Sequence, residues 1–144
     1  MSVSVRKAAT VVLLAPTMDA MRPVKVCMLR RAQRASFFAD AYVFPGGAVG
    51  KDDEEHSSDP FRFAALREVF EESGLLLNAR GCNDRTMTPV PWDALAEQRR
   101  WRRAVLDSGA AAFDDLTRVK HVDLPALQQR LLPWAHWITP AYQT

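Results

Sequence analysis

Residues 59–75 constrain this chain more than any other stretch, because signals for both ends of a helix coincide there with a group of carboxylates. Asp59 can accept hydrogen bonds from the first free N–H groups of a helix, and Pro60 has the backbone angle that suits its first position. Gly74 can adopt the left-handed conformation that ends many helices. The stretch therefore predicts a helix with a defined start and a defined stop.

This helix has an acidic face and an apolar face. At about 100° per residue, Glu68, Glu71 and Glu72 fall on one side of it. The apolar residues gather on the opposite side: Phe63, Leu66, Val69 and Phe70. Ala64 and Ala65 flank the acidic face, and we expect them to leave it open. One face is thus expected to pack in a core and the other to carry chemistry.

The acidic face suits a hard divalent cation. Three carboxylates at this spacing repel one another, and bound Mg²⁺ or Mn²⁺, which prefers oxygen ligands, would relieve that repulsion. The alternative is that the face is simply solvated, as charged helix surfaces often are. The preceding residues favour the first interpretation, because residues 42–47 indicate a short strand that ends in a glycine pair. At glycines the backbone can come close to a ligand.

The strand, the glycine turn and the acidic helix together resemble the Nudix hydrolase family. The family box is G-x5-E-x7-R-E-U-x-E-E-x-G-U, where U is aliphatic, and residues 67–75 match its whole second half. The first half departs from the box, because Gly47 lies six residues too far from Arg67 and Asp59 stands where the box has its first Glu. We therefore expect an inserted, solvated acidic loop at residues 48–58, with His56 on the surface.

The resemblance implies an enzyme that cleaves a diphosphate linkage in a small nucleoside diphosphate derivative, such as coenzyme A or an acyl-coenzyme A. A Mg²⁺ (or Mn²⁺) cofactor would be held by Glu68, Glu71, Glu72 and the carbonyl group of Gly47, and would activate a water molecule. Arg67 would orient the carboxylates. Among the catalytic residues Glu68, Arg67 and Glu71, Glu68 is the best general base within the box, although a loop outside it can supply that role.

Candidate substrate-binding residues lie before and within the glycine turn: Arg30, Arg31, Arg34, Phe44 and Gly46. The three guanidinium groups can bind phosphate oxygens in pairs, or they can be solvated. Phe37 and Phe38 can stack on a base or pack in the core. The Arg99–Arg103 region, which contains four arginines, can bind a second phosphate or form a charged helix surface.

The chain of 144 residues, 48% hydrophobic and 25% charged, fits one domain of the α+β class. The resemblance implies an α/β/α sandwich with a mixed sheet and the box helix packed on it. Strands are predicted at residues 8–15, 24–29 and 75–77, a turn-rich passage at 81–91, and helices at 92–106, 110–118 and 124–132. Residues 1–80 would form the sheet and box helix. Residues 92–140 would be a helical insert or cap, similar to that of the coenzyme A-type subgroup, and we expect the strands that follow it in that subgroup to be missing here.

Partners and location are constrained less strongly. The net charge of +2 selects no nucleic acid, and no apolar run is long enough to span a membrane. Cys27 and Cys82 have no metal-binding spacing, which favours reduced thiols and a cytoplasmic location. The missing strands would leave an apolar face, so we expect a homodimer with Trp134 and Trp137 at the contact. They also keep open a second function, a catalytically inactive nucleotide-binding or interaction module.

Overall fold

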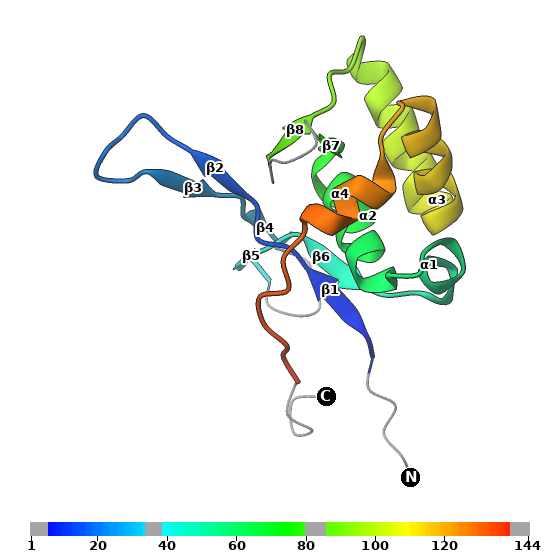
Figure 1. Cartoon of the computed structure of the whole chain (residues 1–144), viewed down its shortest axis with the longest axis horizontal. Coiled ribbons are helices and arrows are strands. Elements are labelled where there is room, and N and C mark those ends of the chain that lie inside the picture. Colours follow the sequence, from blue (N-terminus) through cyan, green and yellow to red (C-terminus); the bar gives the residue numbers. More distant parts are fainter. Residues whose placement is uncertain (1–5, 34–38, 80–85, 139–144) are drawn as a thin grey trace.

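The computed structural model describes residues 6–33, 39–79 and 86–138 and confirms the α+β class. The strands are β1 (Ala8–Thr10), β2 (Leu14–Pro16), β3 (Val24–Val26), β4 (Leu29–Arg30), β5 (Tyr42–Val43), β6 (Gly46–Ala48), β7 (Leu77–Ala79) and β8 (Met87–Pro89). The helices are α1 (Lys51–His56), α2 (Pro60–Ser73), α3 (Leu95–Val119) and α4 (Leu124–Arg130). Figure 1 shows the helices gathered at one side and the β2–β3 hairpin projecting away from them.

The described strands form four antiparallel pairs, β1–β6, β2–β3, β4–β5 and β7–β8, in place of the mixed sheet that we expected. The predicted strand 8–15 is extended but changes partner along its length. Thr10 pairs with Gly46 in β6, whereas Leu14 pairs with Val26 in β3. The chain thus runs from a ladder against the glycine turn into a separate hairpin, which is why one predicted strand appears as two.

The inserted segment contains a helix, so the predicted loop at residues 48–58 is wrong in its centre. Helix α1 occupies Lys51–His56, and the side chain of Asp53 accepts a hydrogen bond of 2.8 Å from the N–H group of Gly50. Short acidic runs are compatible with a helix when they lie in its first turn, where carboxylates meet the positive end of the helix dipole. His56 is exposed, as expected, and its Nδ1 lies 2.8 Å from the carbonyl oxygen of Asp52.

Helix α2 begins and ends where the sequence predicts. The Oδ1 atom of Asp59 accepts from the N–H group of Arg62 at 3.1 Å, and Gly74 has a φ of 75°, in the left-handed region. The apolar face is buried, and so are Ala64 and Ala65, which were expected to flank the acidic face and leave it open. The reason is that α2 lies centrally, in contact with α1, α3, β1 and β6, so small residues are needed where neighbouring elements approach.

Beyond α2 the described chain forms one more hairpin and two helices. Strand β8 lies in the passage that was predicted as turns, and it pairs with β7 from Leu77 opposite Pro89 to Ala79 opposite Met87. The predicted helices 92–106 and 110–118 both correspond to parts of α3, which is broken at Gly109 by a non-helical φ of 57°, so the break falls between them as predicted. The third predicted helix is α4. No helix in the described part of the chain is both long enough and apolar enough to cross a membrane.

The main core lies behind α2 and is built largely by helices. Phe63 and Phe70 are fully buried and meet Phe113 of α3 at ring-centroid distances of 5.5 Å and 6.4 Å. The ring of Trp92 stacks on Phe70 at 5.9 Å. Trp101 is half-buried against this core, whereas Trp134 and Trp137 are 92% and 88% exposed. The core therefore fixes one side of α2 and leaves its acidic side next to the glycine turn.

Candidate active site

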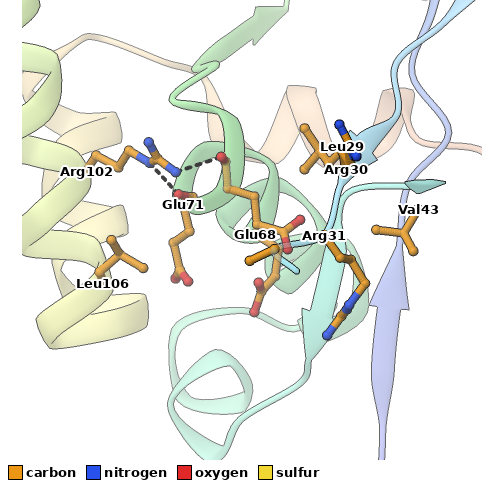
Figure 2. A pocket seen from close by; sticks show the side chains of 10 residues that line it. Leu29, Arg30, Arg31, Val43, Glu68, Glu71, Arg102 and Leu106 are labelled. Atoms are coloured by element: carbon orange, nitrogen blue, oxygen red, sulfur yellow. Dashed lines mark hydrogen bonds between the residues drawn. The ribbon is translucent and has the colours of Figure 1, made fainter. Parts of the chain in front are cut away.

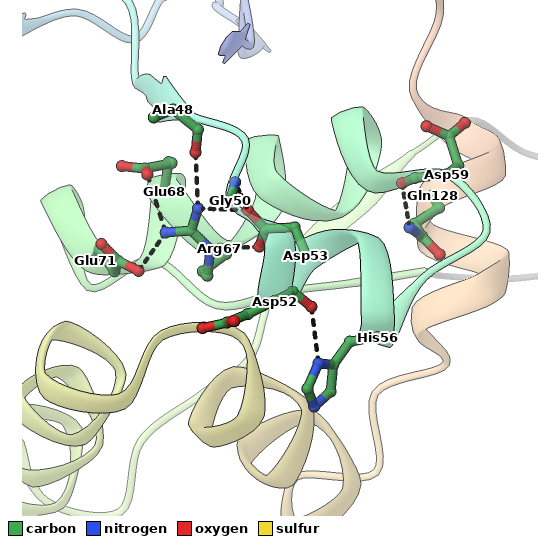
Figure 3. Close-up of polar contacts among 10 residues, drawn as sticks. All are labelled: Ala48, Gly50, Asp52, Asp53, His56, Asp59, Arg67, Glu68, Glu71 and Gln128. Carbon is green, nitrogen blue, oxygen red and sulfur yellow. Dashed lines mark hydrogen bonds and ion pairs between the residues drawn. The ribbon is translucent and has the colours of Figure 1, made fainter. Parts of the chain in front are cut away.

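Arg67 is the centre of the polar network on α2 (Figure 3). Its Nη1 donates to Glu68 at 2.9 Å and to Glu71 at 2.6 Å, and its Nη2 donates to the carbonyl oxygen of Ala48 at 3.1 Å. The side chain is only 9% exposed. Burial lowers the pKa of Arg67, but the hydrogen bonds to Asp53 and Glu71 outweigh it, so the pKa is raised and the group stays charged. Arg67 thus faces two carboxylates of α2 and the main chain of β6.

Asp53 of α1 completes this network, and it corrects our placing of the first acidic residue of the box at Asp59. Its two carboxylate oxygens accept from Nε and Nη2 of Arg67 at 2.8 Å and 3.0 Å, and its side chain is 2% exposed. Asp59 instead caps α2. Asp53 keeps the G-x5-E spacing from Gly47, so the six extra residues lie between Asp53 and Arg67. The spacing of the box allows either Asp53 or Asp59 at its first acidic position, and the contact with Arg67 in the fold identifies Asp53.

The three carboxylates of α2 line one cleft but have different partners. Glu68 and Glu71 are 15% and 13% exposed and both accept from Arg67. Glu72 is exposed, and its Oε2 accepts from the N–H group of Gly46 at 3.0 Å. All three line a cleft of about 580 Å³, which Figure 2 shows from close by. The predicted acidic face is therefore assembled on one wall.

The main chain of the glycine turn lies close to its neighbours, and at Gly46 backbone atoms leave no room for a side chain. A Cβ atom at Gly47 would lie 2.5 Å from the carboxylate carbon of Glu68, so the main chain of β6 abuts that carboxylate. At Gly46, where φ is 155°, a Cβ atom would lie 2.4 Å from the carbonyl oxygen of Ala9. The main chain at Gly47 therefore lies beside the carboxylate of Glu68.

Burial raises the pKa of Glu68, and the charges of Glu71 and Glu72 raise it further, while Arg67 lowers it. A carboxyl group with a raised pKa binds its proton more tightly in the folded than in the unfolded chain. As the pH rises above the ordinary value of 4.5, the unfolded chain loses this proton first, so ionisation of Glu68 costs folding stability.

We expect Glu68→Gln to stabilise the metal-free protein at neutral pH relative to the original chain, because glutamine keeps an acceptor for Arg67 without the buried charge. The advantage should shrink as the pH falls through the folded pKa and disappear near the unfolded value, where Glu68 is protonated in both states. Urea unfolding of both proteins in EDTA at about pH 7 and about pH 4 measures this difference. An advantage that grows at the lower pH contradicts the prediction.

The opposite walls of the cleft carry cations and apolar groups. The other lining residues are Leu29, Arg30, Arg31, Ala32, Val43, Arg102 and Leu106. Two predicted substrate residues, Arg30 and Arg31, are thus present, although Nε of Arg30 also donates to Asp40 at 2.6 Å. Phe44 is 37% exposed and does not line this cleft, and Gly46 contacts Glu72. Arg34, Phe37 and Phe38 lie outside the described residues.

Sequence reasoning did not single out Arg102 or Leu106 for this site, although it considered the Arg99–Arg103 region for a second phosphate. Both come from α3, far from the box, and they lie one helical turn apart, which brings them to the same side of the helix. The sequence signal for Arg102 is its position in the arginine-rich region. Of the four arginines there, Arg102 is the partly buried one. Of its neighbours, Arg103 pairs with Asp107 at 2.8 Å on the exposed surface.

The donor set fits a hard divalent cation in its chemistry, since it consists of three carboxylates and a glycine main chain that abuts one of them. Its present arrangement is not that of a metal site. Among the described residues, no three acidic, histidine or cysteine side chains are grouped closely enough to hold an ion. One oxygen of each of these carboxylates accepts a hydrogen bond, from Arg67 for Glu68 and Glu71 and from the N–H group of Gly46 for Glu72.

Known proteins resemble this chain in sequence and in structure. A Caenorhabditis elegans protein named "Putative nudix hydrolase 7" is 33% identical over 94% of this chain and 39% of its own length. Acyl-coenzyme A diphosphatase NUDT19 of Gallus gallus is 29% identical over 94% of this chain and 50% of its own length. The crystal structure of a NUDIX hydrolase from Alicyclobacillus acidocaldarius matches with a TM-score of 0.57 and 29% identity, over 84% of this chain and 58% of that one.

These matches cover most of this chain but only part of each relative. The chain spans about half or less of the length of the two curated relatives. No family model matches it. Sequence and structure nonetheless agree, because the structural match is 29% identical to this chain over the aligned residues and is named for the same kind of hydrolase as the relatives.

Proposed function

This chain belongs to the Nudix superfamily, and we propose that it hydrolyses a diphosphate linkage in a nucleoside diphosphate derivative with Mg²⁺ or Mn²⁺ as cofactor. The observation that carries the proposal is the cleft itself. Glu68, Glu71 and Glu72 form one wall of it, and cationic side chains of β4 and α3 face them (Figure 2). A diphosphate needs both features, a cation site for its charge and guanidinium groups for its outer oxygens.

In this proposal the residues of the box have separate roles. The cation would be held by Glu68, Glu71 and Glu72 with the Gly47 carbonyl, and it would neutralise the diphosphate and activate water. Glu68 would accept a proton from the attacking water. The water oxygen then bonds to phosphorus, the bridging P–O bond breaks, and the leaving phosphate takes the bond electrons. Arg67 would keep the carboxylates oriented while Asp53 balances its charge.

The other walls would bind the substrate. Arg30 and Arg31, and by our sequence prediction Arg34, would contact phosphate oxygens. Leu29, Val43 and Leu106 add an apolar surface to the same cleft, which suits a substrate with an apolar part beyond its phosphates. We therefore include coenzyme A and acyl-coenzyme A in the proposed substrate class, in line with the name of the Gallus gallus relative.

A catalytically inactive nucleotide-binding or interaction module is the second candidate. The observation that favours it is the network around Arg67, which engages Glu68 and Glu71 so that no acidic cluster ready for a metal exists among the described residues. In such a module Arg67 would replace the cation, and ligand binding would need no metal. The two candidates therefore differ in their response to chelation.

The deciding experiment incubates the protein with a panel of nucleoside diphosphate derivatives, coenzyme A and an acyl-coenzyme A, with Mg²⁺, with Mn²⁺ and with EDTA. Release of a nucleoside monophosphate that EDTA abolishes supports the hydrolase. A thermal shift caused by the same compounds without turnover, and unaffected by EDTA, supports the module. Glu55→Gln, at an exposed position of α1 outside the cleft, is a control for charge changes.

We also propose that two copies of the chain associate through Trp134 and Trp137. Both side chains are almost fully exposed and are followed by Ile138, which is 72% exposed. Large aromatic side chains of this kind are frequent anchors of protein interfaces.

Light scattering should therefore give the mass of a dimer, and changing Trp134 and Trp137 together to serine should give a monomer or aggregates. Met18→Ser with Met21→Ser is the matched control, because these residues of the β2–β3 hairpin are equally exposed. A monomeric original chain at high concentration would refute this assembly.

A further inference from the structure

The carboxyl end of α2 is capped by side chains of α3. The last carbonyl groups of a helix have no partners within it and must find others. Here Arg102 donates from Nε to the carbonyl oxygen of Glu71 at 2.5 Å and from Nη2 to that of Glu72 at 2.7 Å. Gln98 donates to the carbonyl oxygen of Gly74 at 2.9 Å. One planar guanidinium group thus holds two consecutive residues of the box.

These two residues carry carboxylates of the candidate site. Figure 2 shows Arg102 extending from α3 to the main chain at Glu71, while the carboxylate of Glu71 points into the cleft. Arg102 is half-buried and lines the cleft too. A shift of this last turn would move both carboxylates relative to Glu68, which lies one turn earlier in the helix. The bond to Arg102 therefore fixes the spacing between members of the proposed ligand set.

We propose that Arg102 is a positioning residue for the cation site, which it supports by holding the main chain of Glu71 and Glu72 through Nε and Nη2, on one edge of its guanidinium group. This inference rests on the proposed function, because it gives Arg102 a role in the metal dependence of that site. Arg102 acts here through the helix, and its own contact with a phosphate is not needed.

The charge of Arg102 and its hold on the main chain of α2 predict opposite effects on cation affinity when Arg102 is replaced. Removing a positive charge from the wall of an acidic cleft should strengthen the binding of a cation if only electrostatics matter. Releasing the last turn of α2 should weaken it, because groups that orient metal ligands typically change metal affinity by about 10- to 100-fold. A residue that serves only the stability of the fold would leave the affinity unchanged.

The experiment measures the dissociation constant of Mn²⁺ by titration calorimetry, together with the melting temperature, for the original chain, Arg102→Met and Arg103→Met. Methionine has a similar length but no donor, and Arg103 is the neighbouring exposed arginine whose loss changes the net charge equally. We expect Arg102→Met to weaken Mn²⁺ binding about tenfold or more, and Arg103→Met to leave it unchanged. Unchanged or tighter binding by Arg102→Met overturns the proposal.

Arg102→Lys covers the case in which the methionine variant fails to fold. It keeps the charge but lacks the planar fork that reaches two carbonyl oxygens, so we expect weaker Mn²⁺ binding here as well. Binding equal to that of the original chain overturns the role of the fork. If the original chain binds no Mn²⁺, the proposed function fails and this inference fails with it, whereas normal binding by all variants refutes the inference alone.

Discussion

Replacing Asp53 with alanine should lower the free energy of unfolding by about 3 to 5 kcal/mol, which is the usual cost of removing one partner from a buried ion pair. Both oxygens of Asp53 bind Arg67, and the pair lies at 2% and 9% side-chain exposure. Without Asp53 the guanidinium group stays buried with two of its donors unpaired, and the N–H group of Gly50 loses its acceptor. Urea unfolding at neutral pH measures the change.

The matched control is Asp52→Ala, one residue earlier in α1, where the side chain is exposed. It removes the same charge and should change stability by no more than about 0.5 kcal/mol. A double-mutant cycle with Arg67→Ala isolates the pair, and the double variant should lose less than the sum of the two single losses. Equal costs for Asp52→Ala and Asp53→Ala would show that Asp53 is not the structural partner of Arg67.

The helix that carries the box was predictable from sequence because its signals are local. Asp59, Pro60 and Gly74 act within one or two turns of their own positions, so their effect does not depend on the rest of the fold. The acidic face follows from helical periodicity for the same reason. The burial of the residues beside this face does not follow from periodicity. Ala64 and Ala65 are core residues because β1, β6 and α3 pack around α2.

From the sequence we placed the first acidic residue of the box at Asp59, whereas in the structure Arg67 pairs with Asp53 of a separate helix. Asp53 and Asp59 both precede the box helix, and either satisfies half of the family spacing. The choice required knowing that residues 51–56 form a helix that turns Asp53 inward, whereas the acidic composition of this run suggests a solvated loop. Its local signal is the bond from Gly50 to Asp53, a capping contact between residues three apart.

The role of Arg102 could not be predicted from the sequence, because it too depends on a distant element. Four arginines between positions 99 and 103 share one composition signal, and the sequence does not say which of them meets the end of α2. The contact joins residues 30 and 31 positions apart, so only tertiary packing brings them together. The short strands were likewise misread in detail, since pairing partners set where β1 ends and β2 begins.

Changing Glu72 to glutamine should reduce hydrolysis at least about a hundredfold if the proposed function holds, because the metal contributes several kcal/mol and each 1.36 kcal/mol is worth a factor of ten. Glutamine keeps the size of the side chain and can still accept from the N–H group of Gly46, but it removes one unit of charge from the ligand set. Steady-state rates at saturating Mg²⁺ and at several lower concentrations measure the loss.

Stability separates this loss from damage to the fold. Glu72 is exposed and lies beside Glu71 and Glu68, so its neutralisation should leave the metal-free melting temperature unchanged or raise it slightly, by relief of repulsion worth about 0.2 to 0.5 kcal/mol. Glu55→Gln should keep full activity, because that carboxylate is also exposed but does not line the cleft. Retention of most turnover by Glu72→Gln would refute the metal assignment, and a joint fall in melting temperature would point to a structural role for Glu72 at the glycine turn.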